Sequence, residues 1–257
     1  MDRLQLDKNA KLTGRVYFKD EVMWLGLSGS GASFTFDGTK LVLKLKGNNI
    51  AVGENPIDYA RIAVYVDSKR VVDEMINCAE KEVTVIDRTE SAKSVVEIIK
   101  LSESPMSAVG IEAFAEGSAE SLPEKQLKIE FIGDSITCGY GVDDEDENHQ
   151  FTTATEDVTK AYAYKTAKAL DAEYSMFSAS GYGIVSGYTE GDEPISEQTI
   201  PQFYCSYGFS RGNFAGTAPQ DIPWDFSKYI PQIIVINLGT NDDSYCRDHK
   251  DRQAVFS

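Results

Sequence analysis

The pattern of hydrophobic residues changes in kind between residues 117 and 126, and this change divides the chain into two predicted folding units. Before it, short segments alternate between apolar and polar positions. In segment 40–46, Leu41, Leu43 and Leu45 face one way and three lysines face the other. Such period-two alternation is typical of strands that bury one face.

Residues 1–120 are therefore predicted to form an all-β domain. The candidate strands are 15–19, 32–37, 40–46, 60–66, 81–86, 94–101 and 108–115. Turn residues such as Asp37-Gly38 separate them. Many short strands at this spacing indicate a β-sandwich or jelly roll. We expect most of its aromatic residues, including Trp24 and Phe34, to pack in the core.

Segment 117–126 has the composition of a linker, and residues 127–257 have the pattern of an α/β domain. Its predicted elements are a strand at 127–132, a helix at 159–170 capped by Thr159, a strand at 173–178 and a strand at 232–238. The last is a continuous β-branched run, which is typical of a strand buried on both faces. This order of elements indicates a parallel sheet, whose ligands bind beyond the carboxyl ends of the strands.

The charge of the chain restricts its partners. With 41 acidic and 25 basic residues the formal net charge is −16, which disfavours binding to nucleic acid and to anionic membrane surfaces. No apolar run approaches the roughly 18 residues of a membrane span, and no secretion signal is visible at the N-terminus. We therefore expect a cytoplasmic protein, or a secreted one if the N-terminus is incomplete.

No cofactor is expected from the residue pattern. The four cysteines show no CxxC pair and no metal-ligand spacing, so they are interpreted as reduced thiols and no metal site is predicted. The acidic run 143–147 lacks the glycine and the alternate ligands of a calcium loop, and we interpret it as a solvated loop.

Three strand ends carry residues suited to acyl transfer. Gly133-Asp134-Ser135 follows the first strand of the α/β domain, Gly181 follows the second, and Asn241 follows the third. A serine nucleophile with convergent N–H donors is what an ester hydrolase needs, because the oxyanion requires preorganised hydrogen bonds. Each turn alone is also ordinary strand-to-helix turn chemistry, but the three in this order favour a site.

These blocks resemble those of the SGNH (GDSL-type) hydrolases. The longer strings Gly133–Gly141 and Asn237–Asp242, together with the leading β-domain, resemble carbohydrate esterase family 2 in particular. That family comprises acetyl-xylan esterases and related deacetylases, built from an N-terminal jelly roll and a C-terminal SGNH domain with a flavodoxin-like sheet.

The resemblance implies roles for individual residues. Ser135 would be the nucleophile, and its own N–H, Gly181 and Asn241 would form the oxyanion hole. We also assign Asp134 and Tyr182, which neighbour these residues in the sequence, to substrate binding. The implied substrate is an acetylated carbohydrate.

The general base that should activate the serine is not identifiable in the sequence. The resemblance implies an Asp-x-x-His motif downstream, but neither His149 nor His249 lies in one. In addition, Ile233–Ile236 would be left as an unpaired apolar edge. We therefore hypothesise that the catalytic domain is incomplete and needs about 90–110 further residues, from a missing segment or a second polypeptide.

The connection 184–226 is rich in aromatic residues, and long loops at strand ends are usually functional. We expect about half of these aromatics to form a local core, and take Trp224 as a platform for a sugar ring. Two other functions stay open. One is a GDSL lipase or thioesterase, and the other is a non-catalytic carbohydrate-binding fragment.

Overall fold

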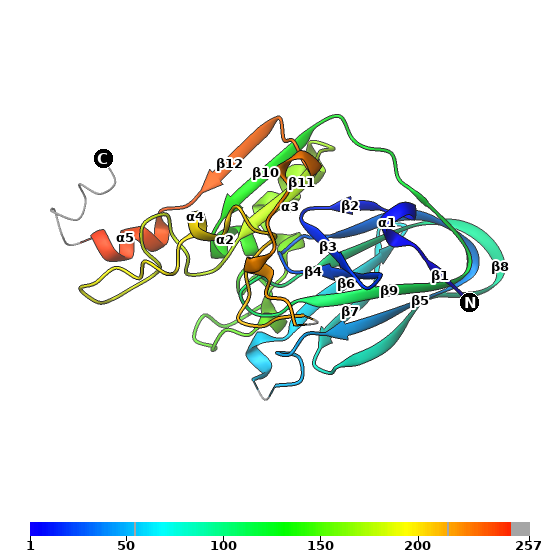
Figure 1. Cartoon of the computed structure of the whole chain (residues 1–257), viewed down its shortest axis with the longest axis horizontal. Helices are drawn as coiled ribbons and strands as arrows, with labels where there is room; N and C mark the ends of the chain where they lie inside the picture. The colour runs from blue at the N-terminus through cyan, green and yellow to red at the C-terminus, as the bar shows by residue number, and fades with distance from the viewer. Residues whose placement is uncertain (54, 215, 248–257) are drawn as a thin grey trace.

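The structure, a computed structural model, describes residues 1–53, 55–214 and 216–247 (Figure 1). Its first part consists of antiparallel strands and two short helical turns. They are β1 (Asp2–Leu4), α1 (Leu6–Asn9), β2 (Lys11–Thr13), β3 (Val16–Lys19), β4 (Val22–Leu25), β5 (Gly31–Gly47), η1 (Pro56–Asp58), β6 (Ala60–Val66), β7 (Lys69–Ile76), β8 (Glu80–Lys100) and β9 (Val109–Ser121). The sheet order is β3-β4-β9-β5-β8-β6-β7, with β1 on β9 and β2 on β5.

Two pairs of predicted strands prove to be continuous. Segments 32–37 and 40–46 are both parts of β5, and 81–86 and 94–101 are both parts of β8. The turn-like Asp37-Gly38 does not break the chain but marks a register shift between Gly38 and Lys40. Gly38 lies opposite Gly117 of β9, and a Cβ atom on Gly38 would lie 2.3 Å from the Glu116 carbonyl oxygen. Glycine is needed there because the two backbones approach closely where the strands bend.

The predicted alternation in 40–46 is confirmed. Leu41, Leu43 and Leu45 are fully buried in the main hydrophobic core together with Phe34. The lysines on the opposite face form ion pairs, for example Lys44 Nζ with Glu80 at 2.7 Å. The strand β7 was not predicted, because half of its residues are charged and it lies at an edge of the sheet.

The second part of the chain is the predicted α/β region. Its elements are β10 (Lys128–Gly133), α2 (Ser135–Cys138), η2 (Thr153–Thr155), η3 (Val158–Lys160), α3 (Tyr162–Ala169), β11 (Glu173–Ser178), α4 (Ile200–Phe203), η4 (Pro219–Asp221), η5 (Phe226–Lys228), β12 (Ile233–Asn237) and α5 (Thr240–Cys246). The three strands are parallel in the order β11-β10-β12, so β10 is central, as expected for a flavodoxin-like arrangement. None of the described helices combines the length and the apolar character that a membrane crossing requires.

The helix predicted at 159–170 is shorter than expected. A 3-10 turn, η3, precedes it and is capped by the Asp157 side chain, which accepts from the Thr159 N–H. The α-helix α3 begins only at Tyr162 and ends at Ala169. Its alanines, Ala163 and Ala167, face the sheet, where small side chains let the helix approach closely.

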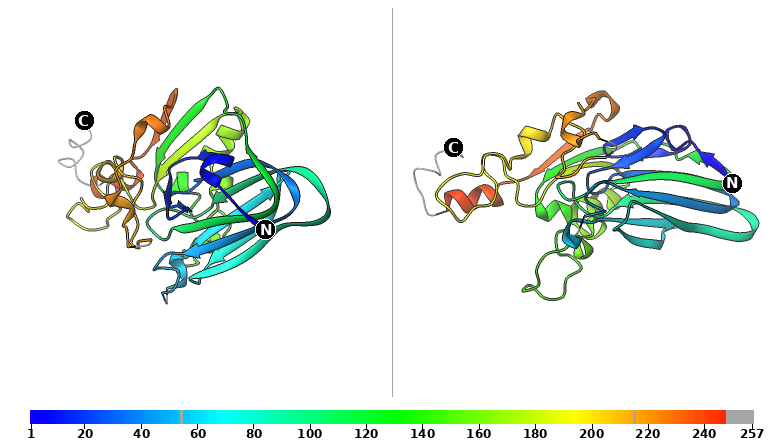
Figure 2. Two further views of the ribbon diagram at one scale, coloured as in Figure 1. Left: turned by 45° about the vertical axis from the view of Figure 1, so that its right-hand side comes forward. Right: turned by 60° about the horizontal axis from the view of Figure 1, so that its bottom comes forward.

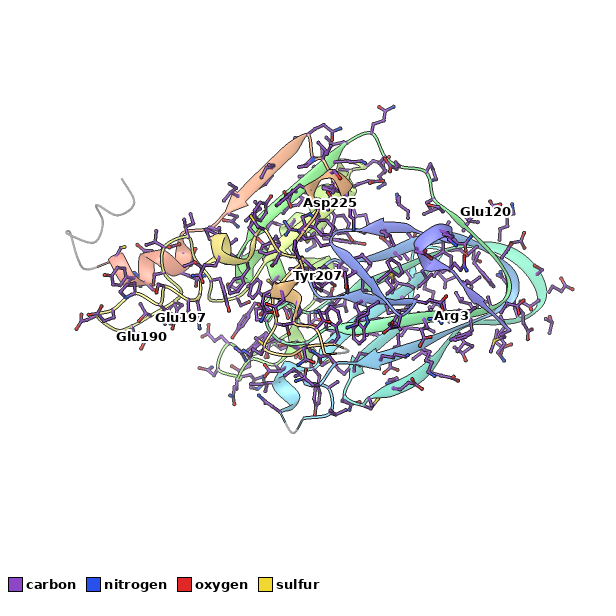
Figure 3. The ribbon with its side chains drawn as sticks, in the orientation of Figure 1. Arg3, Glu120, Glu190, Glu197, Tyr207 and Asp225 are labelled. Carbon is purple, nitrogen blue, oxygen red and sulfur yellow. The ribbon has the colours of Figure 1, made fainter. Side chains whose placement is uncertain are left out.

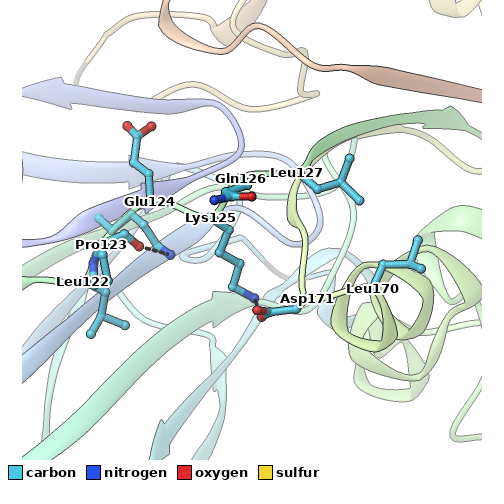
Figure 4. Close-up of a pocket in the computed structure, with 9 residues that line it drawn as sticks. Leu122, Pro123, Glu124, Lys125, Gln126, Leu127, Leu170 and Asp171 are labelled. Atoms are coloured by element: carbon cyan, nitrogen blue, oxygen red, sulfur yellow. Dashed lines mark hydrogen bonds and ion pairs between the residues drawn. The ribbon is translucent and has the colours of Figure 1, made fainter.

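The connection between the two parts is shorter than the predicted linker 117–126. Strand β9 continues to Ser121, and β10 begins at Lys128. A pocket of about 660 Å³ lies beside this connection (Figure 4), where Lys125 pairs with Asp171 at 2.8 Å and Lys11 Nζ donates to the Pro123 carbonyl. Ser135 is not among the residues that line this pocket.

The two parts pack directly on each other, and Figure 2 shows the parallel sheet lying alongside the antiparallel one. One hydrophobic cluster joins Ile99 and Leu101 at the end of β8 to Phe131 of β10 and Met176 of β11. Polar contacts add to it. The guanidinium of Arg61 on β6 donates to the Asp143 carboxylate at 2.9 Å and to the carbonyls of residues 154 and 156.

The fully buried Arg15 makes a second contact between the parts. Its guanidinium donates to the carbonyls of Tyr204 and Ser206 and lies over the rings of Phe177 and Tyr204. Burial lowers the pKa of Arg15, and the nearby Glu130 carboxylate opposes that shift. The charge is thus held between a carboxylate and aromatic faces.

Strand β12 departs from the prediction of a strand buried on both faces. Within the described residues it pairs only with β10, and Ile233, Ile234 and Ile236 are 44%, 54% and 64% exposed. The β-branched run is therefore an apolar edge strand, as the hypothesis of an incomplete domain anticipated. Such an edge can pair with further backbone.

We expect Ile234→Thr combined with Ile236→Thr to reduce self-association in light scattering without unfolding the protein. Both side chains are more than half exposed, so the free energy of unfolding should change by less than about 1 kcal/mol. As a control, Ile129→Thr in β10, at a position 1% exposed, should cost about 2–4 kcal/mol in urea unfolding. Unchanged self-association in the double variant would contradict the edge interpretation.

We expect Arg61→Gln to destabilise the protein more at pH 7 than at pH 3. Burial alone would raise the pKa of Asp143, but hydrogen bonds and charges from Lys160 and Arg61 lower it. A lowered carboxyl pKa gives stability that is present above the unfolded value of about 3.9 and is lost as the pH falls through the folded value. At pH 7 the loss should be about 2–3 kcal/mol in urea unfolding.

The control for this comparison is the exposed Lys69→Gln, which should change stability little at either pH. An equal effect of Arg61→Gln at both pH values would show that the carboxylates do not carry the contact.

Candidate active site

Ser135 is held in a tight turn at the carboxyl end of the central strand. Strand β10 ends at Gly133, and the Asp134 carboxylate caps α2 by accepting from the Ile136 N–H at 3.0 Å. Gly139 ends α2 with a φ of 80°, which favours glycine. Ser135 itself is half-buried at the first position of the helix, so its hydroxyl lies beyond the end of the sheet.

Gly181 lies in the loop that follows β11. It has a φ of 80°, and a Cβ atom there would meet nothing within 4 Å, so its backbone faces open space. Its carbonyl accepts from the Tyr188 N–H at 2.8 Å, which ties the loop back on itself. This geometry leaves room for a ligand beside the peptide group.

Asn241 and Asp242 lie in the first turn of α5, after β12. The Asn241 Nδ2 donates one hydrogen to the Tyr182 carbonyl at 2.7 Å, and the second hydrogen of the amide is not used by that bond. Asp242 is fully buried, and its Oδ1 accepts from the N–H groups of Ile184, Val185 and Ser186 at 2.6–3.0 Å. The carboxylate therefore fixes the loop that carries Gly181 to the helix that carries Asn241.

These three predicted residues meet at one pocket. Ser135, Gly181 and Asn241 line a single open cavity of about 500 Å³. They come from the carboxyl ends of three adjacent parallel strands, which is the edge where such sheets bind ligands. The arrangement can place a carbonyl carbon at the serine with N–H donors on the far side, which is the requirement of acyl transfer.

The remaining walls of the pocket come from segments far apart in the sequence. Tyr140 and Phe151 stack with ring centroids 3.8 Å apart. The antiparallel part contributes Asp58, whose carboxylate lies 3.3 Å from the guanidinium of Arg211. The full set of other lining residues is Ile57, Met106, Gln150, Ser180 and Tyr188.

Three predicted substrate-binding residues are not among those that line this pocket. Asp134 is 1% exposed and acts as the helix cap. The Tyr182 ring packs on Phe203 and Phe209 in a hydrophobic cluster. Trp224 lines a different pocket, against Arg15, so the structure does not bring it together with Ser135.

The aromatic residues of the loop 184–226 mostly form the expected local core. Phe209 and Phe214 are buried, and Tyr207 (labelled in Figure 3) donates its hydroxyl hydrogen to the Trp24 carbonyl at 2.7 Å. Tyr188 differs because it is 52% exposed and lines the pocket with Ser135.

Within the residues that the structure describes, no histidine or other base is hydrogen-bonded to the serine hydroxyl. His149 is exposed and its Nδ1 lies 2.8 Å from the Asp144 carboxylate, in the acidic loop rather than at the site. Across 1–53, 55–214 and 216–247 the Ser135 hydroxyl has no hydrogen-bond partner. His249 lies outside the described residues.

Several pocket residues were missed at the sequence level. Tyr140 and Phe151 flank the acidic loop, and an aromatic on each side of a loop that follows the serine was a usable signal. No signal in the sequence pointed to Asp58, Met106 and Arg211, because only the packing of the two parts brings them to the pocket.

A buried cluster of titratable groups lies beneath the site. Glu103, Cys138 and Glu156 offer ligand atoms that all lie within 4.8 Å of one another, so these are the described residues that could hold a metal ion. Burial raises the pKa of both glutamates and of the Cys138 thiol. Burial also lowers the pKa of the neighbouring Lys100 to about 8. The Lys100 Nζ donates to the carbonyls of Ser102 and Glu103 beside this cluster.

Residues 12–125 match the family Carbohydrate esterase 2 N-terminal. A solved family two carbohydrate esterase from Clostridium thermocellum, in complex with cellohexaose, has a TM-score of 0.75 and 28% identity over 91% of this chain and 67% of that one. The resemblance to carbohydrate esterase family 2 is confirmed.

Two curated relatives of the same kind extend the similarity into the α/β part. Cellulase/esterase CelE of Acetivibrio thermocellus is 31% identical over 220 residues, which are 84% of this chain and 24% of that protein. An acetylxylan esterase / glucomannan deacetylase of Cellvibrio japonicus is 29% identical over 93% of this chain and 62% of that protein. The chain therefore spans less than two thirds of the length of either relative. The family 2 likeness supports the predicted architecture of a jelly roll followed by an SGNH domain.

We expect Asp242→Asn to destabilise the loop of residues 179–188, which carries Gly181 and is called the oxyanion loop below after the role predicted for Gly181. The Asn oxygen would replace a carboxylate oxygen as acceptor of three N–H bonds, and the N–H₂ group would face the Ile184 N–H, which donates to Asp242 Oδ2 at 2.9 Å. About 2–3 kcal/mol of stability should therefore be lost in urea unfolding. Hydrogen exchange of residues 184–186 should also accelerate. The matched control is the adjacent Asp243→Asn, whose carboxylate is 59% exposed and pairs with Arg247, and which should change stability by less than about 0.5 kcal/mol. Equal effects of the two variants would contradict this role for Asp242.

Proposed function

We propose that the chain carries the nucleophile and the oxyanion hole of a serine esterase that removes O-acetyl groups from carbohydrates. The observation that carries the proposal is the convergence of Ser135, Gly181 and Asn241 on one pocket. The names of the relatives, an acetylxylan esterase / glucomannan deacetylase and a cellulase/esterase, support the same reaction.

In the proposed reaction the Ser135 Oγ attacks the acetyl carbonyl carbon and gives up its proton to a base. The oxyanion of the tetrahedral intermediate accepts hydrogen bonds from the N–H of Ser135, the N–H of Gly181 and the Asn241 Nδ2. The sugar hydroxyl leaves with the proton, and water then hydrolyses the acetyl-serine by the reverse steps. Each oxyanion donor typically contributes about 3–4 kcal/mol to the transition state.

The base is proposed to come from polypeptide that pairs with β12. Its exposed isoleucines leave an edge that a further parallel strand would cover, and the carboxyl end of that strand would lie at the same edge as Ser135. A histidine there could reach the serine hydroxyl, for which no described residue acts as partner.

The part of the substrate proposed to bind in this pocket is a sugar ring. The stacked rings of Tyr140 and Phe151 and the exposed ring of Tyr188 offer flat apolar faces at the pocket, and Asp58 and Arg211 offer polar groups for hydroxyls. The structure of the Clostridium thermocellum relative in complex with cellohexaose supports a carbohydrate as the bound molecule. Trp224 stays a predicted platform, at a different pocket.

A non-catalytic carbohydrate-binding role is the second candidate. It is favoured by one observation, namely that the described residues place no base at Ser135. The two candidates differ in whether Ser135 reacts.

We expect this chain to hydrolyse 4-nitrophenyl acetate slowly, and imidazole to accelerate the reaction by acting as the base. Both rates should disappear above background in Ser135→Ala, while His149→Ala should leave them unchanged because that side chain is held by Asp144. Product release is followed by absorbance. If no Ser135-dependent turnover occurs with or without imidazole, the esterase proposal fails and the binding role is favoured.

A further inference from the structure

A loop of the antiparallel part, residues 101–108, runs beneath the candidate active site. It connects β8 to β9, and Ser102, Glu103 and Ser104 in it are fully buried. One of its members, Met106, reaches the pocket that contains Ser135. The β-sheet part is therefore in contact with the site machinery and does more than support it.

Glu103 in this loop makes a direct hydrogen bond to the oxyanion loop. Its Oε2 accepts from the Ser180 N–H at 2.6 Å. Ser180 immediately precedes Gly181, whose N–H is the oxyanion donor of the proposed function. On the other side, the Gly181 carbonyl accepts from the Tyr188 N–H. The peptide that carries the Gly181 N–H is thus anchored at both ends.

We propose that Glu103 is a positioning residue that aims the Gly181 N–H at the oxyanion from the β-sheet part of the chain. This inference rests on the proposed function, because it takes Gly181 as an oxyanion donor. It assigns no catalytic contact to Glu103, which acts through Ser180.

Glu103 is itself rigidly held. Its backbone N–H donates to the Glu156 Oε2 at 3.0 Å, and its carbonyl accepts from the Lys100 Nζ at 3.0 Å. Its Oε2 also lies 4.0 Å from the Sγ of Cys138, which belongs to the helix that begins with Ser135. The carboxylate therefore lies between the nucleophile turn and the oxyanion loop, and a shift of Glu103 would change their relative position.

The energetics favour a functional reason for this group. Burying the side chains of Glu103, Glu156 and Lys100 together costs free energy, and an apolar cluster of similar volume is often at least as stable. The Oε1 atoms of both Glu103 and Glu156 are buried without a hydrogen-bond partner. The other oxygen of each carboxyl group is bonded: Glu103 Oε2 accepts from the Ser180 N–H, and Glu156 Oε2 accepts from the Glu103 N–H. A buried polar atom without a partner needs an explanation, and the bond to the oxyanion loop supplies one.

The test compares two variants of nearly equal volume in the full chain. Glu103→Leu removes the acceptor, and Glu103→Gln retains an oxygen that can accept from Ser180. Hydrogen exchange of the Ser180 amide should accelerate about tenfold or more in the Leu variant, because leucine offers no acceptor. It should accelerate little in the Gln variant, because the Gln side-chain oxygen can still accept from the Ser180 N–H. Exchange of the β10 amides should not change.

The matched control is Glu112→Leu in β9. Glu112 is also buried and ion-paired, with Arg3 and Lys46, but it lies away from the oxyanion loop. It should leave the Ser180 amide unchanged. With acetyl ester as substrate, Glu103→Leu should lower kcat about tenfold or more with KM within about twofold, and Glu103→Gln should restore most of kcat.

The outcomes separate this inference from the proposed function. If wild type shows no turnover, the exchange experiment still tests Glu103. A folded Glu103→Leu protein with an unaccelerated Ser180 amide, or acceleration shared equally by β10, would overturn the inference. If Glu103→Leu fails to fold, the hydrogen exchange of the Ser180 amide in the wild-type protein decides whether the inference holds. Protection of Ser180 comparable to β11 amides supports the role, and exchange at the rate of a free amide overturns it.

Discussion

Parallel pairing of β10 with β11 and β12 is the constraint on which the candidate site depends. In this register Gly133 lies opposite Ser178 on one side and opposite Asn237 on the other. The three strands therefore end at the same level, and the three turns that follow them meet. A slip of one residue in either pairing would turn side chains to the opposite face of the sheet and separate Ser135 from Gly181 and Asn241.

The second element of the site is the packing of the antiparallel part against this sheet. That part contributes Asp58 and Met106 to the pocket wall, and through Glu103 it reaches the loop of Gly181. Arg61 and Arg15 hold the two parts together with hydrogen bonds to backbone carbonyls. The β-domain is thus part of the site and not an appended module, which explains why a short loop between β8 and β9 is so thoroughly buried.

Much of the fold could be predicted because its elements have strong local patterns. The alternation around Leu43 and the apolar strand before Gly133 were predicted correctly. The sequence also predicted that Ser135, Gly181 and Asn241 lie at one site. Boundaries were less predictable. The turn-like Gly38 lies inside a continuous strand, because its neighbour Gly117 allows two backbones to approach there. A local turn signal cannot distinguish a turn from a bend that two strands share.

The sequence by itself determined the two-part organisation, the parallel strands and the three turns that bear Ser135, Gly181 and Asn241, since each depends on a short stretch of chain. Only the tertiary structure decided which other residues join them. It placed Trp224 against Arg15 instead of at the serine, brought Tyr140 and Phe151 face to face, and left the isoleucines of β12 exposed. The physical reason is that contacts between distant segments depend on how whole faces of the two sheets pack, and no local pattern of residues encodes that.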